Sequence, residues 1–230
     1  MGPGVLIDDP SLRDRKAVFA DRVDAGGVLA MLLGQYRGGD GLVLAIPAGG
    51  VPVAVALAGA LGLPVDVAVV SKVTLPWNTE VGYGAVAYDG TTRLNQSVVA
   101  QAGLSEAQID AGIAGTAEKV RRRVRRFRGD RPWPDLAGRP VILVDDGLAS
   151  GCTMFVAVEA VRASGADNVV IAVPTAHTES AQRLAGQVDA LFVANLRGGW
   201  QYAVATAYQR WTDVDEEEAL RLLRDALEPS

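Results

Sequence analysis

Five short runs, apolar except for Asp66 in the second, limit the folds that this 230-residue sequence can adopt. A strand with one exposed face alternates apolar and polar residues, whereas a strand covered on both faces is apolar throughout. The runs alternate with helical stretches, and this alternation is typical of a parallel sheet with helices on both faces. We therefore predict a doubly wound α/β fold around a mostly parallel five-stranded sheet. The predicted strands occupy residues 42–46, 65–70, 141–144, 169–173 and 190–194.

The first predicted strand opens a stretch of 24 residues, 42–65, that has no charged side chain. This length raises the question of a membrane span. Prolines and glycines interrupt the stretch, however, and a strand, a glycine turn and a buried helix account for it better. The first ten residues also lack the basic and apolar regions of a signal peptide. We expect a soluble, cytoplasmic protein without a membrane partner.

The composition excludes several functional classes. Apolar residues make up 49% of the chain and charged residues 21%, as in ordinary globular domains. The net charge of −5 argues against a dedicated nucleic-acid binder, which usually carries a basic excess. The single Cys excludes an internal disulfide and a Cys-rich zinc site, and the single His excludes a two-His metal site within one chain.

Three segments outside the apolar runs have clear helical signals. Residues 18–36 carry apolar residues at helical spacing, and residues 215–227 begin with acidic residues that suit a helix dipole. The longest segment, 105–128, begins with a capping box of Ser105 and Gln108 and continues as one apolar stripe. Residues 72–93 fit neither class, because they are polar and rich in glycine, and we predict a long loop or hairpin there.

Residues 141–154, VILVDDGLASGCTM, combine the parts of an anion site. Four apolar residues end in Asp145 and Asp146, a loop of small residues follows, and Cys152 opens a helix. Small side chains let backbone N–H groups approach an anion, and the positive end of a helix dipole favours negative charge. The two carboxylates suit a neighbouring group rich in donors, such as sugar hydroxyls or a hydrated Mg²⁺. A sugar phosphate would satisfy both requirements.

This segment resembles the phosphoribosyl pyrophosphate (PRPP) signature of the type I phosphoribosyltransferases, and every position of the motif is filled. The resemblance implies that Asp145 and Asp146 hold the ribose 2′- and 3′-hydroxyls, and that they meet Mg²⁺ indirectly, through substrate or water. The alternative is an ordinary strand–turn–helix corner of a doubly wound sheet. The resemblance also implies that the 5′-phosphate is bound by Gly147, Leu148, Ala149, Ser150, Gly151, Cys152 and Thr153.

A second glycine turn, after the first predicted strand, resembles the pyrophosphate loop of the same family. Its residues Ala48, Gly49 and Gly50 would face the diphosphate with their backbone amides. Many relatives carry a basic residue just before the glycines, where this chain has Ala48. Lys72, just after the second predicted strand, could supply positive charge instead. Without the resemblance, an ordinary tight turn between a strand and a helix explains the two glycines as well as a diphosphate loop does.

Residues 72–93 resemble the flexible lid that closes over the site in this family. A lid of this kind keeps water from an oxocarbenium-like ribosyl cation. Glu80 and Tyr83 are candidates for substrate contact or proton transfer, and a surface hairpin without a catalytic residue is the alternative. Parts of this segment, and the stretch from Phe19 to Gly26, resemble a bacterial and archaeal subgroup of undefined substrate. The resemblance therefore covers most of the chain.

The two ends of the chain, about 1–17 and 196–230, are expected to form a small hood that selects the accepting base, as the resemblance implies. Trp200 and Tyr202 could stack on a planar ring, although ordinary packing is the alternative. Thr175, after the fourth predicted strand, is expected to line the same pocket. The predicted plan is thus a single domain over 1–230, with a core of about 37–195 and a lid of about 72–93.

Residues 119–131 form a basic run, with eight basic residues and one acidic residue, in an otherwise acidic chain. The run could bind nucleic acid. Its apolar positions continue a helical stripe, however, so we favour a solvated arginine face or a contact with acidic residues of another subunit. Pairing of two copies through this helix or through the N-terminal helix stays open.

These features together predict an enzyme, a phosphoribosyltransferase that uses Mg²⁺–PRPP. It would transfer the 5-phosphoribosyl group to a nitrogen nucleophile, such as a nucleobase, and release pyrophosphate. The alternative from another class is a regulator that senses PRPP without turnover and binds nucleic acid through residues 119–131. A third reading is a sugar-phosphate-binding or hydrolytic protein on a similar sheet. The sequence does not identify the acceptor.

Overall fold

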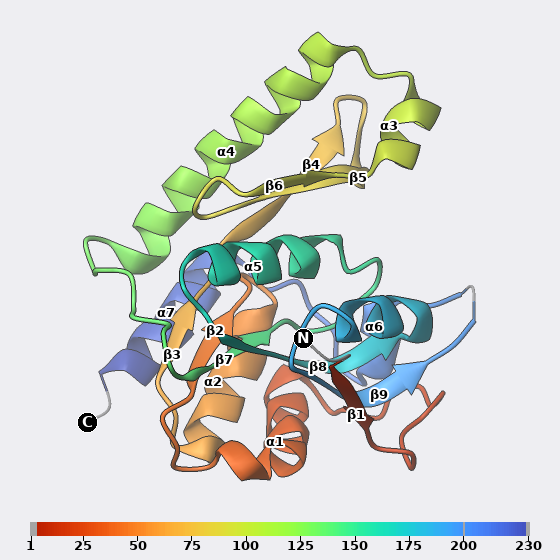
Figure 1. Ribbon diagram of the computed structural model, residues 1–230. Coiled ribbons are helices and arrows are strands. Elements are labelled where there is room, and N and C mark those ends of the chain that lie inside the picture. The colour runs from red at the N-terminus through yellow and green to blue at the C-terminus, as the bar shows by residue number, and fades with distance from the viewer. Residues whose placement is uncertain (1–3, 200, 229–230) are drawn as a thin grey trace.

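A six-stranded parallel sheet forms the centre of the computed structural model, which describes residues 4–199 and 201–228 (Figure 1). The strand order is β1-β9-β8-β7-β2-β3, and every neighbouring pair is parallel. The predicted α/β fold with a mostly parallel sheet is therefore confirmed. The strands are β1 (Val5–Asp8), β2 (Leu42–Ala45), β3 (Val65–Val67), β7 (Pro140–Val144), β8 (Asn168–His177) and β9 (Ala190–Arg197).

The prediction of five strands was one short, because residues assigned to the hood form the edge strand β1. Val5 pairs with Ala190 and Asp8 pairs with Val193 of β9. The segment carries a weak apolar signal, since an edge strand has little of its surface covered, and Val5 is 59% exposed. Only the part of the N-terminal segment that follows β1 is therefore available to the hood.

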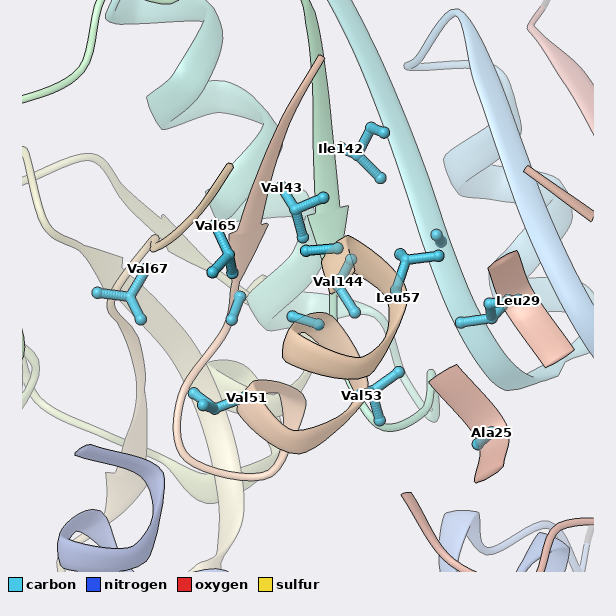
Figure 2. Packing of buried hydrophobic residues seen from close by; sticks show 14 of the residues in the cluster. Ala25, Leu29, Val43, Val51, Val53, Leu57, Val65, Val67, Ile142 and Val144 are labelled. Carbon is cyan, nitrogen blue, oxygen red and sulfur yellow. The ribbon is translucent and has the colours of Figure 1, made fainter. Parts of the chain in front are cut away.

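Side chains of the parallel sheet alternate between two buried layers, as a doubly wound sheet requires. Val43 of β2 and Val144 of β7 face the layer that contains Leu57 of α2 (Figure 2). Leu44 and Leu143, one residue away in each strand, belong to the opposite buried cluster. The first layer contains α1 (Arg22–Leu32), α2 (Gly50–Leu61) and α7 (Glu216–Leu227), and the second contains α5 (Cys152–Ala163) and α6 (Thr178–Ala185).

The segment predicted as a lid forms a three-stranded antiparallel sheet of its own. This sheet lies beside α5, away from the parallel sheet, with a long helix along its other side (Figure 1). The helix α4 begins at the predicted capping box, where the Ser105 hydroxyl accepts from the Gln108 N–H and the Gln108 side chain accepts from the Ser105 N–H. The elements are β4 (Val70–Leu75), β5 (Asn78–Ala87), β6 (Thr92–Leu94), α3 (Gln96–Ala102) and α4 (Glu106–Arg128).

Segments from both ends of the chain, which we call the hood, meet beside the parallel sheet. Phe19, ahead of α1, pairs in a short parallel bridge with Tyr208, and their rings lie 5.6 Å apart. The hood includes the 3-10 turn η2 (Val204–Ala207), and a second such turn, η1 (Gly34–Tyr36), follows α1. In the described ranges, no helix is both long and apolar enough to span a bilayer.

Candidate functional site

A cavity of about 750 Å³ opens at the carboxyl ends of β2 and β7. Ligands of open α/β sheets bind in this kind of crevice. The loop after β2 and the loop after β7 form its floor, Lys72 of β4 and residues of α4 form one wall, and Val204 of the hood borders it. The cavity therefore lies between the parallel sheet, the lid and the hood.

Hydrogen bonds to the next strand hold the loop after β7 in place. The Leu148 N–H donates to the Thr175 carbonyl, and the His177 N–H donates to the Leu148 carbonyl, both over 2.9 Å. A Cβ on Gly147 would lie 2.4 Å from a methyl carbon of Val204, so this position has room only for glycine. The loop therefore passes between β8 and the hood and presents Asp145 and Asp146 at the cavity.

The start of α5 gives one end of the cavity the character of an anion site. The first N–H groups of a helix have no partner inside the helix, and the helix dipole is positive there. Gly151 takes φ +78° immediately before the helix, which glycine adopts without strain. The lining residues here are Ala149, Ser150, Gly151 and Thr153, all of which belong to the predicted phosphate loop.

Cys152 does not line the cavity, although it belongs to the same predicted loop. Its side chain packs partly buried against the second apolar cluster, and burial raises the pKa of its thiol. Its N–H donates to the Ser150 hydroxyl over 3.4 Å. Cys152 is therefore a packing residue at the helix start, where a thiol of raised pKa makes a poor nucleophile.

The glycine turn after β2 packs directly against the two carboxylates. A Cβ on Gly49 would lie 2.3 Å from Oδ2 of Asp146, and a Cβ on Gly50 would lie 2.7 Å from the Val144 carbonyl oxygen. Both positions consequently exclude any side chain. The peptide bond between Pro47 and Ala48 is cis. The two predicted loops are thus neighbours in space, although about 100 residues separate them in the chain.

The two carboxylates share a poorly hydrated environment that disfavours their charged forms. Burial raises the pKa of Asp145 well above its ordinary value, the neighbouring Asp146 carboxylate raises it further, and the Lys72 ammonium partly opposes the rise. Burial also raises the pKa of Asp146, against the opposing effect of Arg22. A ligand that brings hydroxyl donors or a cation to this pair would stabilise the ionised forms.

Arg22, at the start of α1, is a site residue that the sequence analysis missed. Its Nε and Nη2 atoms each lie 2.9 Å from Oδ2 of Asp146, and its Nη1 donates to the Thr212 carbonyl over 2.8 Å. The guanidinium also lies 3.8 Å from the centre of the Trp211 ring. Arg22 belongs to the stretch from Phe19 to Gly26, but nothing in the sequence indicates a partner 124 residues away.

A residue of the hood, Tyr208, also holds Asp146, through its backbone. The Tyr208 hydroxyl donates to the Asp146 carbonyl over 2.5 Å. Burial, followed by the nearby Asp146 carboxylate, raises the pKa of this phenol far above its ordinary value, so it stays protonated and keeps its donor. Segments near the two ends of the chain therefore both fix the position of Asp146.

Most arginines of the basic run on α4 form ion pairs with carboxylates of this chain. Arg123 donates to Glu216 of α7 over 2.6 Å, to the Ser71 hydroxyl over 3.1 Å and to the Pro47 carbonyl over 3.0 Å. It thereby ties α4 to the glycine turn after β2. The further ion pairs of the run are Arg121–Glu118, Arg122–Glu118, Arg126–Glu216, Arg126–Glu217, Arg128–Asp66 and Arg131–Asp66.

The remaining predicted residues are spread over several environments. Lys72 lines the cavity. Thr175 is fully buried, where its hydroxyl donates to Oδ1 of Asn195 and accepts from Tyr202, so it supports the loop after β7 from behind. Glu80 is exposed on β5 and does not line the cavity, whereas its neighbour Thr79 does. Trp200 lies outside the described residues.

Tyr83 requires a correction, because its side chain is completely buried between β5 and α4. A Cβ on Gly112 of α4 would lie 1.9 Å from the Tyr83 hydroxyl, so the ring packs directly on the helix backbone. The hydroxyl has no hydrogen-bond partner among the described residues, and burial raises its pKa. Tyr83 therefore joins the lid sheet to α4 and does not reach the cavity.

The carboxylates of Asp145 and Asp146 are oxygen donors of the kind that Mg²⁺ prefers. Within the described ranges, no cluster of three or more His, Cys, Asp or Glu side chains forms a protein cage for a metal. A pair of carboxylates suits an ion that keeps water and substrate oxygens as its other ligands. The residues present therefore fit a Mg²⁺ ion that arrives with a phosphorylated substrate.

The fold and the cavity define a class of doubly wound α/β proteins with an anion site and an acidic pair at the carboxyl edge of the sheet. Residues 23–207 match the family model of the phosphoribosyl transferase domain. The chain belongs to this family. The resemblance of the 141–154 segment to the family signature is thereby confirmed.

The relatives support the same family. Two curated proteins from Mycobacterium tuberculosis, from strains CDC 1551 and H37Rv, are both named as proposed phosphoribosyl transferases and are 39% identical over 206 residues. The match covers 90% of this chain and 46% of each relative, so this chain spans about half of their length. The crystal structure of TT1426 from Thermus thermophilus is 33% identical, with a TM-score of 0.68, over 89% of this chain and 97% of that one.

Proposed function

We propose that the protein transfers the 5-phosphoribosyl group of Mg²⁺–PRPP to a nitrogen nucleophile and releases pyrophosphate. One observation carries the proposal: the acidic pair, the start of α5, the glycine turn after β2 and Lys72 all meet at a single cavity. PRPP has a ribose, a 5′-phosphate and a diphosphate. The carboxylates suit the ribose because they accept hydrogen bonds from hydroxyl groups. The helix start suits the 5′-phosphate, and the glycine turn beside a cation suits the diphosphate.

In this proposal, each part of the site has a defined task. Asp145 and Asp146 accept hydrogen bonds from the ribose hydroxyls and orient the sugar. Backbone N–H groups of residues 149–153 and the Thr153 hydroxyl bind the 5′-phosphate. Gly49 lets the backbone approach the diphosphate, and Lys72 stabilises the negative charge that develops as pyrophosphate leaves. When bound, Mg²⁺ supplies further neutralisation of that leaving group.

The acceptor would enter between the lid and the hood. A nucleobase or a related planar ring suits the space bordered by Val204 and by the small residues of α4. The lid sheet and α4 would exclude water from the ribosyl cation. A cytoplasmic location and a homodimer remain parts of the proposal that solution measurements would test.

A regulator that senses PRPP without turnover is the second candidate, and Ala48 is the observation that favours it. The absence of a basic side chain there would weaken stabilisation of the leaving group without preventing binding. The arginines of α4 give less support to nucleic-acid binding, since five of the six have a carboxylate partner within the chain.

Calorimetry with the Asp145→Asn, Asp146→Asn double variant tests the assignment of the site. We expect the affinity for Mg²⁺–PRPP to fall at least about tenfold, because amides accept hydroxyl hydrogen bonds more weakly than carboxylates. Asp225→Asn, at a carboxylate that is 68% exposed on α7, is the matched control and should bind as the wild type does. Unchanged PRPP affinity in the double variant would show that the site is wrongly assigned.

Pyrophosphate release in the presence of PRPP and a panel of purines, pyrimidines and their precursors separates the two candidates. Release with one of these acceptors supports the enzyme. Binding of PRPP without release for any acceptor supports the regulator. Equal affinity for ribose 5-phosphate and PRPP would instead indicate a general sugar-phosphate site.

A further inference from the structure

The glycine turn after β2, which borders the cavity where the diphosphate is proposed to bind, has no basic side chain of its own. Ala48 precedes the glycines of the turn after β2, and its methyl group contributes no charge. A departing pyrophosphate needs positive charge close to its oxygens. The structure brings two basic residues of α4, Lys119 and Arg123, to this cavity in addition to Lys72.

Arg123 uses most of its hydrogen-bond donors to hold the loop after β2 and the segments packed against it. Its guanidinium donates to Glu216, to the Val70 carbonyl, to the Ser71 hydroxyl and to the Pro47 carbonyl. Arginine has five N–H donors, so at most one remains for a ligand. The Glu216 carboxylate also neutralises much of its charge. Arg123 therefore fixes the peptide that precedes the glycine turn and is poorly placed to be the main counterion of a diphosphate.

Lys119 differs from Arg123 in each of these respects. It lies one helical turn earlier on the same face of α4 and lines the same cavity. Its side chain is exposed, and among the described residues it has neither an ion-pair nor a hydrogen-bond partner. The adjacent Glu118 is engaged by Arg121 over 2.6 Å. The ammonium group of Lys119 thus has all three donors available for a ligand.

We infer that Lys119 binds the diphosphate group of the substrate beside a glycine turn that has no basic side chain of its own, while Arg123 positions the loop. This inference rests on the proposed function, because PRPP is the ligand that brings a diphosphate to the cavity. A lysine suits the role, since its compact charge sits on a flexible stem and can follow the leaving group.

The test compares Lys119→Gln with Arg122→Gln, which removes the same charge from the outer face of α4, where the side chain is 61% exposed. Calorimetry measures Mg²⁺–PRPP, Mg²⁺–pyrophosphate and ribose 5-phosphate with each full-length variant. For Lys119→Gln we expect the Kd of the two diphosphate ligands to rise about tenfold or more, as for the loss of one charge-assisted contact, with no change for ribose 5-phosphate. Lys119→Arg should recover part of the loss, and Arg122→Gln should match the wild type.

Equal PRPP affinity in the Lys119→Gln and Arg122→Gln variants would overturn the inference and leave the proposed function intact. An equal loss for ribose 5-phosphate would also overturn it, because the effect would then not concern the diphosphate. If the wild type itself does not bind PRPP, the proposed function fails first, and the inference fails with it. Lys119→Ala serves as a second variant should Lys119→Gln not fold.

Discussion

Replacement of Arg22 by methionine should destabilise the protein in a pH-dependent manner. Arg22 and Asp146 form an ion pair whose side chains are only 8% and 16% exposed. Removing one partner of a buried pair leaves the other charge uncompensated, which costs about 3–5 kcal/mol. The lost stacking on Trp211 adds to the effect, whereas water reaching Asp146 reduces it. We therefore expect a loss of about 3 kcal/mol in the free energy of unfolding at pH 8.

The sign of the pH dependence follows from Asp146. Burial already raises the pKa of Asp146 in the folded protein, and Arg22 opposes that rise. Without Arg22 the pKa rises further, so the carboxyl takes up a proton at a higher pH. A protonated Asp146 no longer needs a cation. The destabilisation should therefore be largest above the folded-state pKa and should shrink as the pH falls through it, for example from 8 to 5.

Urea denaturation at pH 8 and pH 5 measures both the magnitude and its pH dependence. Arg210→Met is the matched control, because Arg210 pairs with Asp21 over 2.6 Å but is 70% exposed. An exposed pair contributes about 0–1 kcal/mol, so this variant should lose little at either pH. A loss in Arg22→Met no larger than in Arg210→Met, or a loss that grows toward pH 5, would refute the reasoning.

Two further predictions concern packing around the site. Gly49→Ala should lower the free energy of unfolding by about 1–3 kcal/mol and weaken PRPP binding, because its Cβ would lie 2.3 Å from Oδ2 of Asp146. The control is Gly59→Ala, which lies in open space on α2 and should be neutral or slightly stabilising. Urea titration measures both variants. Tyr83→Phe should leave stability and pyrophosphate release unchanged, since the hydroxyl against Gly112 has no described partner. A strong loss of turnover at unchanged stability would show that the Tyr83 hydroxyl takes part in the reaction.

The apolar runs predicted the parallel sheet well, because strands covered on both faces leave an unambiguous pattern. Their ends were less predictable. The strand β8 continues to His177 and β9 continues to Arg197, several residues beyond the apolar runs, and these extensions carry polar residues that support the site. Strand β1 was missed because an exposed edge imposes little pattern on four residues.

The site was predictable where its parts lie close together in the chain. Asp145, Asp146 and the start of α5 form one continuous segment, and its chemistry can be read residue by residue. Arg22 and Arg123 could not be found in this way, because their partners Asp146 and Pro47 lie 124 and 76 residues away. Tyr83 was misjudged for a related reason, since sequence position in a lid does not show which face a side chain takes.

The two side chains that hold Asp146, those of Arg22 and Tyr208, lie just outside the residues that the family model matches. The family match spans residues 23–207, so it begins one residue after Arg22 and ends one residue before Tyr208. A chain shortened to those limits would retain the glycine turn, the acidic pair and every strand of the parallel sheet except β1. It would nevertheless lose both the cation that faces the Asp146 carboxylate and the phenol that holds its backbone. The unit that holds Asp146 in place is therefore wider than the region that the family model matches.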